Sequence, residues 1–208
     1  MAGARLVTAL TVAGALSFVA AGMARPGFVP ATQTPSGQAQ PAASAASPAP
    51  FTVVEKGVFH LQPEMQAGRL TSRQVVEAYL ARIRAYDKAG LNINAFITIN
   101  PRALEIADAL DAERRAGKWR GPLHGIPVVV KDNYATIDMP TTAGSKALAG
   151  FETGRDAFMV KRLRDAGAII LGKTNLSEWA NFRGQRSISG WSAVGGLTRN
   201  PHALPNVF

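Results

Sequence analysis

The sequence of 208 residues contains no cysteine. This absence excludes a disulfide framework, a cysteine-based zinc site and a thiol nucleophile. Histidine is also scarce, and His60, His124 and His202 are too scattered to indicate a metal site, so no metal or other cofactor is implied. Long basic runs are missing as well. The net charge of +9 is dispersed in short groups, and the sequence therefore does not predict nucleic-acid binding.

Acidic residues are absent from the first 50 positions, which differ in composition from the rest of the chain. Residues 1–24 have the pattern of a signal peptide, because Arg5 precedes an apolar run, Leu6–Ala21, and small residues suited to cleavage follow. We expect export to the periplasm or medium, with no stable membrane insertion after cleavage. If the segment is not cleaved, it would anchor the protein to a membrane.

Residues 25–50 consist mostly of Pro, Ala, Ser, Gln and Thr and cannot bury a core, so they are predicted to be a disordered linker. The folded domain is expected over residues 51–208. Hydrophobic periodicity and capping signals predict three helices, over residues 71–86, 100–116 and 155–166, and three strands, over residues 91–99, 126–131 and 168–172. The two later strands are apolar throughout and have helices between them, which indicates an α/β sheet covered on both faces.

One segment, Gly121–Asn133, carries the main chemical signal, because an apolar run ends there at Lys131. A lysine that loses its hydration has a lowered pKa, and its neutral amine can then act as a base. The alternative is a surface lysine that ends a strand. Lys173 follows the second apolar run and is interpreted as a residue where the chain leaves the strand, whereas His124 is interpreted as a hydrogen-bonding loop residue rather than a base.

Six ordered segments together resemble the amidase signature enzymes. They are Gly121–Asn133, Thr142–Ser145, Arg162–Ala168, Gly172–Ala180, Ser189–Ser192 and Thr198–Pro201. The resemblance covers nearly all of the folded part. The sequence from Ser177 to Ser192 is most similar to that of bacterial peptide amidases, which remove the carboxy-terminal amide of peptide amides. It implies the amino-terminal part of a mixed-sheet α/β/α fold and a small-molecule or peptide amide as the substrate.

The resemblance also implies a mechanism with two serines and one lysine. Lys131 matches the lysine, which accepts a proton through a bridging serine from the serine that attacks the amide carbon. Backbone N–H groups would stabilise the oxyanion, and water would then hydrolyse the acyl-enzyme. The resemblance places Ala180 and Asn181 near the acyl pocket as candidate substrate-lining residues, with packing as the alternative role. Loop serines such as Ser192 are interpreted as turn or cap residues.

The sequence departs from the family pattern at Pro205–Phe208, where a Gly/Ser-rich stretch with the bridging serine would be expected. Of the catalytic set, these 208 residues contain only Lys131. We therefore expect residues 51–208 to be a truncated amidase domain that does not hydrolyse amides alone and leaves an open edge beside Val128–Val130. The alternatives are a non-catalytic exported fragment or pseudoenzyme, and a component of the glutamyl-tRNA amidotransferase type, although a signal peptide argues against that cytoplasmic chemistry.

Overall fold

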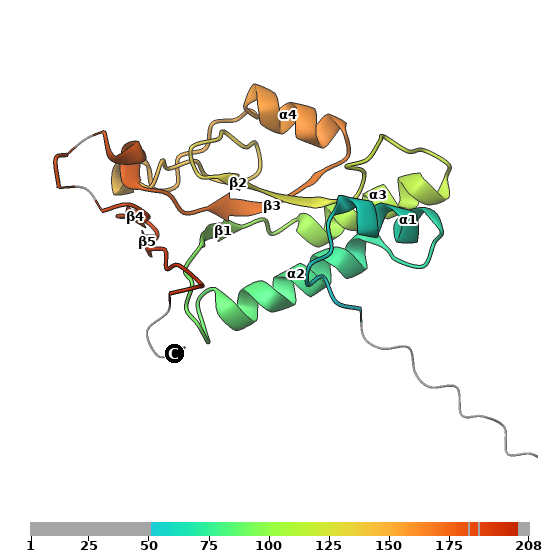
Figure 1. Ribbon diagram of the computed structural model, residues 1–208. Coiled ribbons are helices and arrows are strands. Elements are labelled where there is room, and N and C mark those ends of the chain that lie inside the picture. The colour runs from blue at the N-terminus through green and yellow to red at the C-terminus, as the bar shows by residue number, and fades with distance from the viewer. Residues whose placement is uncertain (1–50, 183, 187, 204–208) are drawn as a thin grey trace, which may run out of the picture. The chain divides into compact units, whose positions relative to one another are not determined.

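The computed structural model describes residues 51–182, 184–186 and 188–203 (Figure 1). The predicted signal peptide and linker therefore lie outside the described residues. The helices are α1 (Val58–Gln66), α2 (Ser72–Tyr86), α3 (Ala103–Arg115) and α4 (Phe158–Asp165), with short 3₁₀ turns η1 (Lys146–Leu148) and η2 (Glu178–Asn181). The strands are β1 (Phe96–Ile99), β2 (Pro127–Lys131), β3 (Ile169–Thr174), β4 (Trp191–Ser192) and β5 (Gly196–Leu197).

The central sheet has the strand order β1-β3-β2. Strand β3 pairs with β2 in parallel and with β1 in antiparallel orientation, so the sheet is mixed. Residues 169–173 of β3 are all buried, because this strand has a neighbour on each side and helices on both faces. The predicted α/β fold class is confirmed. A separate small hairpin is formed by β4 and β5.

Helices cover both faces of the sheet (Figure 1). Helices α2 and α3 lie on one face, where Val76, Ala107 and Leu110 pack against Ile169 and Leu171 of β3. Helix α4 lies on the opposite face, where Val160, Val130, Met139 and Ile170 form a second cluster. The alternation of strand side chains between the two faces explains why consecutive residues of β3 belong to different clusters.

The amino-terminal end of α2 has the predicted capping box. Thr71 Oγ1 accepts a hydrogen bond from the N–H of Gln74, and Gln74 Oε1 accepts one from the N–H of Thr71. Buried Asp111 of α3 also accepts the Ser72 N–H at 2.7 Å, which attaches the start of α2 to its neighbour. These contacts satisfy amide groups that a helix terminus leaves without intrahelical partners.

Three predicted elements begin later in the structure than the sequence pattern indicates. The strand predicted over residues 91–99 comprises only Phe96–Ile99, because Asn92 and Asn94 adopt left-handed backbone angles incompatible with a regular strand. The helix predicted over residues 155–166 begins at Phe158, and the one expected at Asn100 begins at Ala103. In each case residues outside regular helix or strand occupy the start that the sequence pattern assigned to the element.

Strand β2 is less buried than its apolar sequence predicts. Among the described residues it pairs only with β3 and so forms one edge of the sheet, as expected for Val128–Val130. Val130 is buried against α4, whereas Val129 on the other face is 44% exposed. No helix in the described ranges is both long and apolar enough to cross a membrane.

Candidate active site

Lys131 is the last residue of β2 and lies opposite Thr174 of the parallel strand β3. Carboxyl ends of parallel strands are where α/β folds place ligands and reacting groups, so the position fits a functional lysine. The side chain is exposed in the described structure. The desolvation that a lysine base requires is therefore not supplied by the described residues.

The next residue, Asp132, forms a fully buried ion pair with Lys173. Asp132 Oδ1 lies 3.0 Å from Lys173 Nζ, and both side chains are 0% exposed. Lys173 Nζ also donates hydrogen bonds of 2.9 Å to the Pro140 carbonyl and to Thr141 Oγ1. The ammonium thus has two hydrogen-bond acceptors and the carboxylate charge of Asp132 beside it, which makes its burial tolerable.

The other oxygen of Asp132 holds the loop that follows β2. Asp132 Oδ2 accepts hydrogen bonds from Thr142 Oγ1 and from the Thr142 N–H. The backbone carbonyl of Asp132 accepts the Ala143 N–H at 3.0 Å. Thr142 Oγ1 in turn accepts the Gly144 N–H at 3.0 Å. One buried carboxylate therefore fixes the backbone beside Lys131 and the loop over residues 140–144.

The interpretation of Lys173 as a residue outside the strand is wrong. It lies inside β3, and burial lowers its pKa, while the hydrogen bond and charge of Asp132 oppose that shift. The sequence contained one signal for this pair: a lysine extends an apolar run, and an aspartate directly follows another. Only the parallel pairing of β2 with β3 brings the two side chains together.

The loop over residues 140–144 connects the end of β2 to a strained turn. The Ala143 carbonyl accepts the N–H of Trp179 at 3.1 Å. Trp179, Ala180 and Asn181 then have positive φ angles of 47°, 55° and 65°. Left-handed backbone is unfavourable for non-glycine residues by about 1–2 kcal/mol each, except that asparagine tolerates it better, and consecutive examples are rare.

This turn contains both predicted substrate-lining residues. Ala180 is exposed, and Asn181 is half-buried with its Nδ2 3.4 Å from Ser189 Oγ. Two backbone hydrogen bonds connect the turn to Asp132, the residue after Lys131. The Trp179 N–H donates to the Ala143 carbonyl, and the Ala143 N–H donates to the Asp132 carbonyl. The structure therefore connects Ala180 and Asn181 to the strand end that carries Lys131, and their contact with a substrate stays a prediction.

Loop serines hold backbone turns, as predicted, rather than forming a nucleophile and base pair. Ser145 Oγ accepts the N–H of Ala147 at 3.4 Å and caps η1. Buried Ser192 donates from Oγ to Asn175 Oδ1 at 2.7 Å. Ser177 Oγ accepts the N–H of Gly190 at 2.9 Å, and Ser189 Oγ accepts a hydrogen bond from Asn181 Nδ2 at 3.4 Å. Ser187 lies outside the described residues.

His124 is a structural residue, which confirms its interpretation as a hydrogen-bonding loop residue. Its side chain is 0% exposed, and Nε2 lies 2.9 Å from the Leu110 carbonyl. The Arg120 N–H donates to Nδ1 at 3.3 Å. A neutral ring with its proton on Nε2 satisfies both contacts, so the ring is fully engaged in packing the loop against α3.

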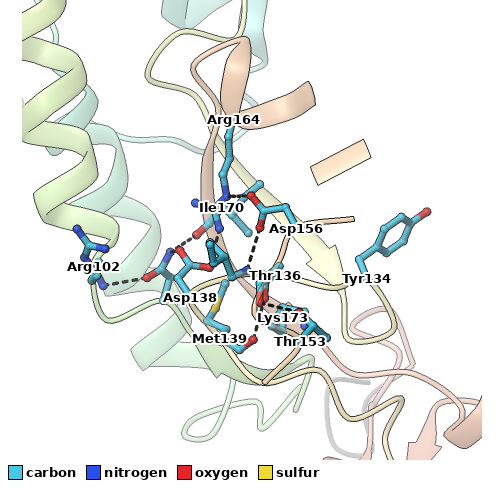
Figure 2. Close-up of polar contacts among 12 residues, drawn as sticks. Arg102, Tyr134, Thr136, Asp138, Met139, Thr153, Asp156, Arg164, Ile170 and Lys173 are labelled. Carbon is cyan, nitrogen blue, oxygen red and sulfur yellow. Dashed lines mark hydrogen bonds and ion pairs between the residues drawn. The ribbon is translucent and has the colours of Figure 1, made fainter. Parts of the chain in front are cut away.

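A second polar cluster, on the α4 side of the sheet, holds the segment that follows β2. Figure 2 shows Arg164 between Asp138 and Asp156. Arg164 Nη2 lies 2.6 Å from Asp138 Oδ1, and Arg164 Nε lies 3.0 Å from Asp156 Oδ2. Asn100 Nδ2 donates to Asp138 Oδ2 at 2.9 Å and to the Ile170 carbonyl at 2.8 Å. These contacts connect three parts of the fold: helix α4, strand β3, and the segment that follows β2. The cluster therefore has a structural role.

Comparison with known proteins gives the family. The sequence profile of the amidase family matches residues 74–207. The chain is 47% identical over 155 residues to a candidate amidase of Schizosaccharomyces pombe, a match that covers 74% of this chain and 26% of that protein. It is 43% identical over 139 residues to a component of the glutamyl-tRNA(Gln) amidotransferase of Rhodopirellula baltica, with coverage of 66% and 26%.

Among solved structures, the native peptide amidase of Stenotrophomonas maltophilia is similar, with 57% identity and a TM-score of 0.71. The match covers 72% of this chain and 31% of that enzyme. The chain therefore belongs to the amidase family and shares its fold over the matched residues. It spans about a quarter of the length of the curated relatives that it matches.

Proposed function

We propose that this chain supplies the lysine-bearing part of an amidase that hydrolyses carboxamide C–N bonds. The observation that carries the proposal is the position of Lys131 at the carboxyl end of a parallel strand, inside a segment shared with a peptide amidase at 57% identity. The buried Asp132–Lys173 pair supports it, because this pair fixes the backbone next to Lys131 without itself reaching solvent.

In the proposed reaction Lys131 acts as a neutral amine. It accepts a proton by way of a bridging serine while a second serine attacks the amide carbon, and both serines come from the part of the family fold that the relatives contain beyond this match. The C–N bond then breaks, the amine leaves with a proton returned along the same relay, and water hydrolyses the acyl-enzyme. Ala180 and Asn181 would line the acyl side of the substrate.

Peptide amides are the substrate class that we propose. The similarity from Ser177 to Ser192 supports this choice, as does the amino-terminal pattern of Arg5 and Leu6–Ala21, which favours action outside the cytoplasm on a peptide or small-molecule amide. A glutamine-dependent amidotransferase is the second candidate, because components of the glutamyl-tRNA(Gln) amidotransferases of several bacteria are 38–46% identical to this chain.

A chimera tests the proposal. Residues 51–203 of this chain replace the matched part of the Stenotrophomonas maltophilia enzyme, and release of ammonia from a peptide amide and from glutamine is measured. We expect hydrolysis of the peptide amide, and a loss of about 100- to 10,000-fold in Lys131→Ala, the range typical of a general base. The matched control is Lys118→Ala, which removes another exposed lysine, one that lies between α3 and β2 and outside the strand end.

Two results would contradict the proposal. One is a folded chimera in which Lys131→Ala and Lys118→Ala have equal activity, since Lys131 would then have no part in proton transfer. The other is a chimera that releases ammonia from glutamine but not from peptide amides, which would favour the amidotransferase alternative. The full 208-residue chain alone should release no ammonia from either substrate.

A further inference from the structure

The buried pair of Asp132 and Lys173 forms hydrogen bonds with four consecutive residues of the loop after β2. These residues are Pro140, Thr141, Thr142 and Ala143. Lys173 Nζ is the donor to the first two residues, at 2.9 Å each. Asp132 accepts from the other two, through its Oδ2 atom and its backbone carbonyl. Because both side chains of the pair are fully buried, water does not compete for these contacts.

The loop and the turn that it contacts both contain strained backbone. Ala143 has a φ angle of 50°, and the next positive values are those of Trp179, Ala180 and Asn181 in the turn. Left-handed backbone at such residues persists only where surrounding contacts impose it. Ala143 is held on both sides, because its N–H donates to the Asp132 carbonyl at 3.0 Å and its carbonyl accepts the Trp179 N–H at 3.1 Å. The contacts of Asp132 thus extend to the first strained residue of the turn.

Lys131 is held by different contacts. It lies opposite Thr174 in the parallel pairing of β2 with β3, and the Asp132 N–H donates to the Thr174 carbonyl at 3.0 Å. The Lys131 carbonyl accepts the Tyr134 N–H at 2.9 Å. Strand pairing therefore fixes Lys131, whereas the ion pair fixes the loop that leads to the turn. The separation between the candidate base and the candidate acyl pocket depends on the pair of Asp132 and Lys173.

We propose that Asp132 and Lys173 are positioning residues, which set the turn Trp179–Asn181 at a fixed distance from Lys131 through the loop over residues 140–143. This proposal rests on the proposed function, because it concerns the same site. Neither side chain is exposed, so the pair acts through the loop and takes no part in proton transfer. Misplacement of a reacting group by about 1 Å can cost on the order of 100-fold in rate, so the arrangement of this loop affects catalysis.

Two substitutions of Thr142 test the positioning in the chimera with the Stenotrophomonas maltophilia enzyme. Thr142→Val keeps the shape of the side chain but removes the hydroxyl, which donates to Asp132 and accepts the Gly144 N–H at 3.0 Å. Thr142→Ser keeps the hydroxyl and is the matched control. We expect Thr142→Val to raise KM for a peptide amide by about tenfold with a smaller change in kcat, because the turn moves while Lys131 stays in its strand. Thr142→Ser should have the KM of the unsubstituted chimera.

A double variant separates positioning from stability. Lys173→Met combined with Asp132→Asn leaves no unpaired buried charge, so it should regain much of the stability that Lys173→Met alone loses. Methionine cannot donate to the Pro140 carbonyl or to Thr141 Oγ1, however. The folded double variant should therefore keep a kcat/KM about 10- to 100-fold below that of the unsubstituted chimera. Recovery of kcat/KM together with stability would overturn the proposal, since the pair would then serve stability alone.

Hydrogen exchange in the full 208-residue chain tests the connection without any activity. The Trp179 N–H donates to the Ala143 carbonyl, and it should exchange at least about tenfold faster in Thr142→Val than in Thr142→Ser. The Asp132 N–H, which donates to β3, is the internal reference and should exchange equally in both variants. Equal exchange of the Trp179 N–H in the two variants would overturn the proposal, as would equal KM values.

The same measurements distinguish a failure of positioning from a failure of the proposed function. Faster exchange of the Trp179 N–H in Thr142→Val, in a chimera whose hydrolysis does not depend on Lys131, would support the connection from Asp132 to the turn and contradict the proposed function. Lys131-dependent hydrolysis that is the same in Thr142→Val and Thr142→Ser would support the proposed function and contradict the positioning role.

Discussion

Replacement of Lys173 by methionine should destabilise the fold by several kcal/mol. Methionine keeps most of the length of the side chain but removes the ammonium that lies 3.0 Å from Asp132 Oδ1. The aspartate would then stay buried with only Thr142 contacts to its carboxylate. Removal of one member of a buried ion pair typically costs about 3–5 kcal/mol, because the other charge is left uncompensated.

This loss is large relative to the whole stability of a domain, which is typically about 5–15 kcal/mol. Urea unfolding of the full chain, followed by far-UV circular dichroism, measures it. The matched control is Lys161→Met, because Lys161 pairs with Asp165 at 2.7 Å but both side chains are more than 60% exposed. An exposed pair of that kind contributes about 0–1 kcal/mol.

A double variant tests the cause of the loss. Asp132→Asn removes the negative charge while it keeps an oxygen that can accept from Thr142, so Lys173→Met combined with Asp132→Asn should recover much of the stability. If Lys173→Met is no more destabilising than Lys161→Met, or if the double variant is additive, burial of an unpaired charge is not the physical reason.

Two further predictions concern backbone geometry next to the candidate site. Gly144→Ala should destabilise the fold by about 2 kcal/mol or more, since Gly144 has φ +78° and a new Cβ would lie 2.6 Å from Ser192 Cβ; an unchanged urea midpoint would contradict this. Ala180→Gly should be neutral or stabilise by about 0.5–1 kcal/mol, because glycine relieves the left-handed strain at φ 55°. A clear loss of stability in Ala180→Gly would show that the turn is not strained.

Local signals in the sequence predicted part of this fold well. The capping box of Thr71 and Gln74 depends on residues three positions apart and forms as expected. The apolar run that became β3 also predicted a buried strand correctly. In both cases neighbouring residues carry the information, either through a side-chain cap or through a continuous apolar segment.

Other features depended on partners distant in sequence. The antiparallel orientation of β1 follows from its pairing with β3, which lies much later in the chain. The link from the end of β2 through Ala143 to Trp179 likewise joins three separate segments. Residue patterns within one segment cannot specify such pairings, because they do not encode which strand becomes the neighbour.

The two lysines show the division most clearly. The sequence by itself determined that Lys131 and Lys173 each extend an apolar run, and the surrounding segments determined membership in the amidase family. Only the tertiary structure decided that Lys173 is buried and paired with Asp132 while Lys131 is exposed. The physical reason is position in the sheet: β3 lies between two strands and under helices on both faces, whereas among the described residues β2 has a neighbouring strand on one side only.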